Sequence, residues 1–130
     1  MTRFLLTCLL WVVTGSSLAQ TFACQFVASA GLQWEGGSWV TKTFKKDQPF
    51  FIGLNQDGKT IDTKTISKKL LTYPTCDEGA FISCFDGTGA LLLFALSAMK
   101  GAYVQTIGSV IPDSRPKDTL SVSPFICQKM

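Results

Sequence analysis

Apolar and polar residues alternate with a period of two over much of the chain beyond residue 20, as they do in strands that bury one face. Residues that favour turns, mainly glycine, proline and asparagine, separate these segments. The pattern predicts strands over residues 21–27, 49–54, 81–85, 90–96, 102–110 and 119–127. With the hairpin described next, this makes about seven or eight short strands, so we expect a mainly β fold, a small antiparallel barrel or sandwich.

Residues 31–41 predict a β-hairpin, because Gly36-Gly37 can adopt the positive φ angles of a two-residue turn. In that register Trp34 lies directly opposite Trp39, and both indoles share the more apolar face of the hairpin. The pair has two interpretations. It is either an exposed aromatic surface that binds a sugar ring or a partner protein, or a cross-strand pair inside the core.

Two other segments carry distinct signals. Residues 62–71 place Ile66 and Leu70 four positions apart among lysines, which predicts one short amphipathic helix capped by Asp62 or Thr63. Residues 111–117 contain two prolines and predict an exposed loop. A further proline, Pro124, predicts that the last strand lies at a sheet edge or carries a bulge.

The N-terminal residues have the form of a secretory signal peptide, with Arg3 followed by an apolar run over residues 4–13. Small residues precede the expected cleavage between Ala19 and Gln20. The run is shorter than the roughly 20 residues that span a bilayer, so we expect no membrane span. The sequence therefore predicts a signal peptide over residues 1–19 and a single mature domain over residues 20–130, secreted or periplasmic.

Cysteine usage agrees with export. Of the five cysteines, Cys8 leaves with the signal peptide, and an even number remains, which is typical of two disulfides in an exported domain. Three connectivities are open; we favour Cys24 with Cys127, which ties the chain ends together, and Cys76 with Cys84, which closes a short loop. No C-x-x-C pair and no histidine is present, so the sequence argues against zinc, and we expect no cofactor. Thr21 stands three residues before Cys24, where a lipidated cysteine usually has an apolar residue, which argues against a lipid anchor.

The net charge and the residues available for catalysis argue against nucleic-acid binding and against triad-type hydrolysis. Loss of Arg3 lowers the formal net charge from +3 to +2, and no basic-aromatic pattern is present, so we expect no nucleic-acid partner. The absence of histidine removes the usual base of a hydrolytic triad. Asp77, Glu78 and Asp86 are the candidate carboxylates for cleaving a polysaccharide, although all three flank predicted turns.

Residues 31–39, residues 121–127 and the signal-type N-terminus together resemble short exported bacterial proteins of unknown function. The resemblance covers most of the mature domain. It implies an extracytoplasmic location in a bacterium and carries no activity, substrate or site residue.

The leading hypothesis is a non-enzymatic, disulfide-stabilised binding module whose partner is an unidentified protein or glycan, bound through Trp34 and Trp39. One alternative is an inhibitor of an extracellular hydrolase such as lysozyme, by analogy of fold alone. An alternative of another class is a polysaccharide-acting enzyme that uses Asp77, Glu78 or Asp86.

Overall fold

The computed structural model describes residues 19–106 and 119–130. The predicted signal peptide, apart from Ala19, and the predicted loop over residues 111–117 lie outside the described residues. Within them the protein is mainly β, and no helix is both long and apolar enough to cross a bilayer. The described strands are β1 (Thr21–Phe26), β2 (Ala30–Glu35), β3 (Ser38–Thr43), β4 (Phe50–Gly53), β5 (Thr75–Asp77), β6 (Ile82–Phe85), β7 (Ala90–Ala95), β8 (Lys100–Gln105) and β9 (Thr119–Lys129). Two 3₁₀ turns accompany them, η1 (Thr63–Thr65) and η2 (Leu96–Ala98).

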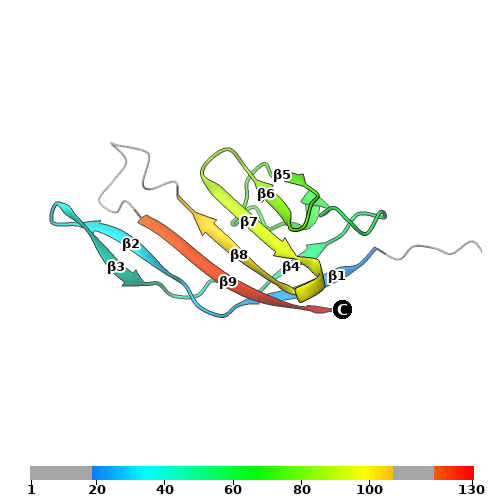
Figure 1. Cartoon of the computed structure of the whole chain (residues 1–130), viewed down its shortest axis with the longest axis horizontal. Coiled ribbons are helices and arrows are strands. Elements are labelled where there is room, and N and C mark those ends of the chain that lie inside the picture. Colours follow the sequence, from blue (N-terminus) through cyan, green and yellow to red (C-terminus); the bar gives the residue numbers. More distant parts are fainter. Residues whose placement is uncertain (1–18, 107–118) are drawn as a thin grey trace, which may run out of the picture.

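All of these strands pair antiparallel in one curved sheet, in the order β3-β2-β9-β8-β7-β6-β5; β1 also pairs with β9, and β4 pairs with β1 (Figure 1). One edge of β9 is shared, because β2 pairs with Thr119–Val122 and β1 pairs with Phe125–Lys129. The strand order of the described residues does not return to its start, so the sheet is open. The fold is therefore sandwich-like, and the barrel alternative is wrong.

The prediction that the last strand lies at an edge or carries a bulge is also wrong, because β9 is paired on both sides and its register with β8 is unbroken. Its Pro124 is tolerated at the junction between β1 and β2. The N–H of Val27 donates to the Pro124 carbonyl over 2.9 Å, and an extended residue directs its nitrogen to the same side as its carbonyl. The missing N–H thus faces the break between β1 and β2, and the pairing of Pro124 with Ala102 of β8 is unaffected. At the same junction the buried Ser123 hydroxyl donates to the Ser29 hydroxyl over 2.8 Å.

The core lies on the concave face of the sheet and is dominated by phenylalanine. Phe125 of β9 packs edge-on against Phe26 and Phe50, with ring centroids 6.0 and 5.1 Å away. The apolar run of β7 divides between the two faces, since Ala90, Leu92 and Phe94 are buried while the residues between them are only half-buried. The opposite, convex side is called the outer face below.

The predicted helix over residues 62–71 is wrong, because only the 3₁₀ turn η1 forms there. Asp62 caps this turn, as expected, by accepting from the backbone N–H of Lys64 over 3.1 Å. The segment covers the edge of β4 instead of coiling: Gly53 donates to Thr65 Oγ1 and accepts from the N–H of Asp62. Backbone groups that cap a sheet edge in this way are not available for helical hydrogen bonds.

The connection over residues 62–71 also contributes side chains to the core. Ile66 and Leu70 are buried, as their spacing predicted, although the backbone around them is irregular. The Tyr103 hydroxyl donates to the Leu70 carbonyl over 2.9 Å, and this bond holds the connection against β8. Burial, with smaller contributions from the negative charges of Asp86 and Asp47, raises the pKa of Tyr103 to about 12. Tyr103 therefore stays a neutral donor at all physiological pH values.

Both expected disulfides are present. Cys24 of β1 lies opposite Cys127 of β9 and is joined to it inside the core, across a sequence separation of 103. Cys76 and Cys84 join β5 to β6 across a separation of 8. The sequence pattern did not predict β5, but the cysteine spacing was a signal for it, because a bridge across eight residues suits a short hairpin.

Candidate functional site

Strands β2 and β3 form a hairpin, here called the arm, that extends beyond the layered part of the molecule (Figure 1). Among the described residues, the arm pairs with the rest of the sheet only where Ala30–Gln33 lies beside β9. None of its residues is buried. Its turn is the one predicted, with positive φ angles of 57° at Gly36 and 87° at Gly37. The arm is therefore a surface element that contributes nothing to the core.

The arm carries the tryptophan pair in the predicted register, with Trp34 directly opposite Trp39. The two rings meet edge to face, with centroids 5.5 Å apart and planes inclined at 72°. Each side chain is 41% exposed, and neither belongs to the hydrophobic core. The two indoles thus stabilise each other and still present a large apolar surface to solvent.

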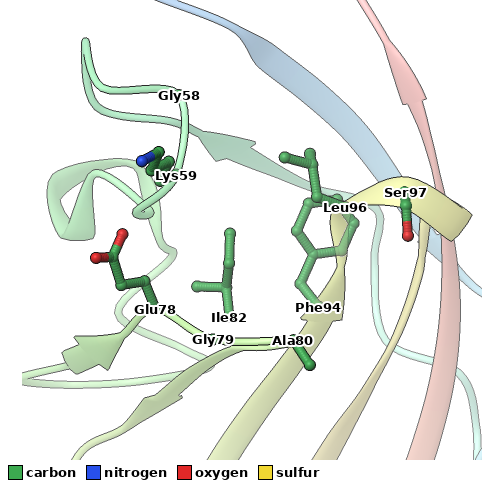
Figure 2. Close-up of a pocket in the computed structure, with 9 residues that line it drawn as sticks. All are labelled: Gly58, Lys59, Glu78, Gly79, Ala80, Ile82, Phe94, Leu96 and Ser97. Carbon is green, nitrogen blue, oxygen red and sulfur yellow. The ribbon is translucent and has the colours of Figure 1, made fainter.

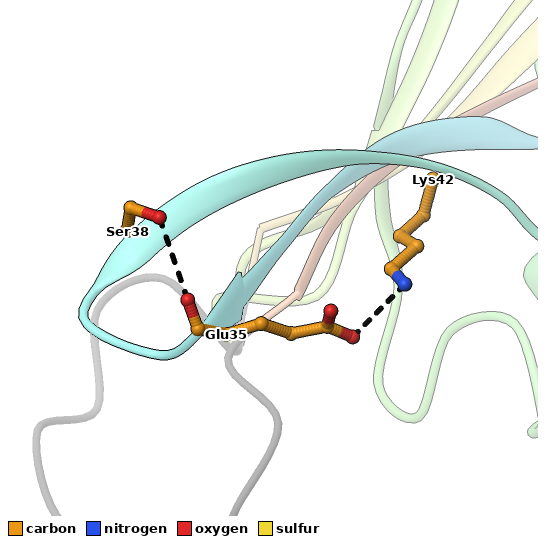
Figure 3. A network of polar contacts seen from close by, with 3 residues as sticks. All are labelled: Glu35, Ser38 and Lys42. Atoms are coloured by element: carbon orange, nitrogen blue, oxygen red, sulfur yellow. Dashed lines mark hydrogen bonds and ion pairs between the residues drawn. The ribbon is translucent and has the colours of Figure 1, made fainter.

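The other face of the arm carries the polar side chains of Glu35, Ser38 and Lys42 (Figure 3). The Lys42 ammonium lies 3.0 Å from the Glu35 carboxylate, and the Ser38 hydroxyl donates to the Glu35 carbonyl over 3.4 Å. Both charged side chains are more than a third exposed, so solvent screens the pair and it is worth less than about 1 kcal/mol. Glu35 and Lys42 are the only charged residues of the arm, so the arm carries no net charge, and their contact links the turn end of β2 to the far end of β3.

An apolar row crosses the outer face of the sheet and meets the arm. The strand registers place Phe85, Leu91, Val104, Val122 and Ala30 side by side, on successive strands from β6 to β2. Phe85 and Val122 are 44% and 45% exposed. Side chains alternate along β2, so Trp34 stands on the same face as Ala30. A continuous apolar surface of this kind is typical of an interaction site. The alternation pattern did not predict this row, although the unbroken apolar run of residues 90–96 was a signal for it.

A cleft of about 630 Å³ is lined by none of the residues of the arm or the apolar row (Figure 2). It lies between the turn at Gly58 and Lys59, the β5–β6 connection and the start of η2. The floor belongs to the core, since Ile82 and Phe94 are 4% and 0% exposed. The exposed Lys59 and Glu78 side chains stand at its rim.

The three candidate carboxylates do not line one cavity. Glu78 lines this cleft, whereas Asp77 and Asp86 do not. Asp77 is an exposed residue of β5, and Asp86 lies in the β6–β7 turn. Paired carboxylate chemistry needs two such groups on opposite sides of one bond, and this arrangement does not supply them.

Asp86 is held in a structural role. Its Oδ1 accepts from the N–H and the hydroxyl of Thr88 over 2.9 and 2.6 Å, and its Oδ2 accepts from the N–H of Thr72 over 3.2 Å. Partial burial raises the pKa of this carboxyl, but the hydrogen bonds from Thr88 and Thr72 outweigh it, and the net shift is downward from 3.8. A general acid at neutral pH needs the opposite shift.

Replacing Asp86 with asparagine is expected to lower the free energy of unfolding at pH 7 by about 1 kcal/mol, the worth of a typical hydrogen bond. Because its pKa is lower when folded than when unfolded, the stabilisation is present above pH 3.8 and is lost as pH falls through the folded value. Urea denaturation from pH 7 to pH 2 measures this, with Asp77→Asn as the control. A difference between Asp86→Asn and the native protein that stays constant with pH contradicts the assignment.

Among residues 19–106 and 119–130, no cluster of histidine, cysteine, aspartate and glutamate is suited to hold a metal ion. Comparison of the chain with models of protein families, with curated proteins and with solved structures finds no match. The candidate site is therefore the tryptophan pair of the arm together with the apolar row of the outer face, and its geometry is the ground for the assignment.

Proposed function

We propose that this protein is an exported, non-enzymatic binding module that recognises a protein partner through Trp34 and Trp39. One observation carries the proposal: a tryptophan pair, 41% exposed on each side chain, stands on an arm that buries none of its own residues. Burial of large aromatic side chains supplies much of the binding energy at protein interfaces. An arm with no role in the core is free to provide it.

Two features support export. The N-terminal residues have the form of a signal peptide, and both cysteine pairs of the mature domain are disulfides, which persist in oxidising compartments. We place the domain in the periplasm or outside the cell.

The ring geometry favours a protein over a glycan. Sugars stack on flat, open aromatic faces, whereas here one indole meets the other at 72° and the pair forms an angled apolar surface. The apolar row of the outer face extends that surface toward β6. Such a shape suits the apolar centre of a protein interface.

Truncating either tryptophan to alanine is expected to weaken partner binding at least tenfold and to leave the fold intact, because neither side chain lies in the core. Affinity capture of exported proteins on the immobilised domain, followed by titration of the captured partner, measures the loss. Phe81→Ala is the matched control, since Phe81 is an aromatic residue 60% exposed and away from the arm. Folded Trp34→Ala and Trp39→Ala proteins that bind as tightly as the native one would refute the proposal.

The projection of the arm favours one specific kind of partner. A narrow hairpin that extends beyond the rest of the molecule suits a concave surface, such as the active-site cleft of an extracellular hydrolase (Figure 1). A direct assay of lysozyme activity with the domain in large molar excess tests the first such enzyme, and purified peptidoglycan tests glycan binding in the same series. Unchanged lysozyme activity removes that enzyme as the target.

A further inference from the structure

Within residues 19–106 and 119–130, the backbone of β3 forms a free edge of the sheet. Glu35 and Ser38 flank the two-residue turn and exchange hydrogen bonds, and every second pair along the hairpin then does the same. The N–H of Phe44, which donates to the Ser29 carbonyl over 2.9 Å, continues that alternation. Trp39, Thr41 and Thr43 must therefore direct their N–H and C=O groups away from β2.

The part of the chain that the structure describes provides no hydrogen-bond partner for these outward groups. The other edges are shorter: β4 has four residues, of which Gly53 is capped by the segment around Asp62 and Thr65, and β5 has only three. By contrast, β3 has six residues, no proline and no bulge in its pairing. Its one lysine, Lys42, is held by Glu35. An unprotected edge of this length is a template for another strand.

We propose that β3 pairs antiparallel with β3 of a second copy of this chain, about a two-fold axis through Thr41. In this register Thr41 lies opposite Thr41 of the second copy, and Trp39 lies opposite its Thr43. All three outward residues of each strand are engaged, which gives about six hydrogen bonds between the copies. A two-fold pairing uses the same surface on both subunits, as is usual in dimers.

The side chains agree with this register. Thr43 lies beside Ala30, at the end of the apolar row on the outer face. Trp39 of the second copy stands next in that row, so the apolar surface continues from one subunit to the other. Lys42 of one copy lies opposite Val40 of the other, so no like charges face each other directly across the two strands. The continuity of the row favours a second copy over an unrelated peptide as the added strand.

This pairing goes beyond the proposed function, because it uses the backbone edge of β3 and not the indole side chains. It would set two tryptophan pairs on one continuous face. A bivalent surface of this kind binds a partner with repeated sites more tightly than a single arm does.

A cysteine at the two-fold axis tests the register. Cys24, Cys76, Cys84 and Cys127 are all in disulfides, so Thr41→Cys adds the only free thiol of residues 20–130. Directly opposite residues that exchange hydrogen bonds have Cα atoms about 5.5 Å apart, within reach of a disulfide. Mild oxidation should give a covalent dimer with Thr41→Cys and none with Thr43→Cys, whose equivalents lie about four residues apart. Equal cross-linking of both variants would contradict the register.

A proline at the same position tests the edge. The outward N–H of Thr41 makes no bond within the hairpin, so Thr41→Pro removes a donor only from the proposed interface. Light scattering over a wide concentration range should show the native mass doubling and the Thr41→Pro protein remaining monomeric with native circular dichroism. Val40→Pro, which removes an inward N–H, is the control for damage to the hairpin itself. A native protein that stays monomeric at about 1 mM overturns the proposal and leaves the tryptophan-binding test unaffected.

Discussion

Removing the Cys24–Cys127 disulfide by a double substitution to alanine is expected to lower the free energy of unfolding by about 4–5 kcal/mol. The bridge closes a loop across a sequence separation of 103, so its loss frees nearly the whole domain in the unfolded state. Both sulfurs also lie in the core, where Cys24 and Cys127 are 2% and 6% exposed, and their removal leaves a small cavity. A loss of this size is a large part of the stability of a typical domain.

The second disulfide is the internal control. Cys76 and Cys84 are only 8 residues apart, and the chain-entropy model then gives about 2.5 kcal/mol. Urea denaturation of the two double variants, without reductant, measures both losses against the native protein. Equal losses would mean that loop length does not control the stabilisation, and that strain or packing at the bridges dominates instead.

Local patterns predicted the local structure well. The two glycines at positions 36 and 37 fix the hairpin turn, and the turn fixes the register that sets Trp34 opposite Trp39. Alternation likewise identified β1 and β9, because a strand with one buried face shows its period in any short window. The preferred cysteine pairing is also confirmed: Cys24 and Cys127 lie on strands near the two chain ends, and Cys76 and Cys84 are close enough in sequence for a short hairpin.

Features that depend on distant residues were not predictable in this way. Pro124 indicated an edge, but β9 is central, because its missing N–H falls at the junction of two strands on the same side. The spacing of Ile66 and Leu70 indicated a helix, but the segment instead forms hydrogen bonds with Gly53 at the edge of β4. In both cases a tertiary contact outweighs a local preference.

The candidate site shows the same limit. The sequence placed both tryptophans on one face of a hairpin but left open whether that face lies in the core or in solvent. The answer depends on where β2 joins β9: the arm pairs with Thr119–Val122, whereas the core lies beneath the other half of that strand. Nothing in residues 31–41 alone carries that information.

Replacing Gly31 with alanine is expected to separate the arm from the sheet while the core stays folded. A Cβ at this position would lie 1.8 Å from the Leu120 carbonyl oxygen of β9, where ordinary contact needs at least 3.4 Å. Since the obstruction is backbone, β2 must move away by more than an ångström, which disrupts its pairing with β9 on both sides of Gly31. The arm buries no residue of its own, so this pairing is its main attachment and its loss should detach the whole hairpin.

Amide hydrogen exchange resolves this outcome residue by residue. Protection in Gly31→Ala should fall at least tenfold over Ala30–Gln33 and Thr119–Val122 and stay near native over β6 and β7. Gly79→Ala is the matched control, because a Cβ there meets only the Phe81 carbonyl, at 3.4 Å, and its exchange should match the native protein throughout. Uniform loss of protection in Gly31→Ala would mean that the arm and the core unfold as one unit. Selective loss would make the same variant a direct test of the proposed function, because partner binding should then be lost while both tryptophans remain in the chain.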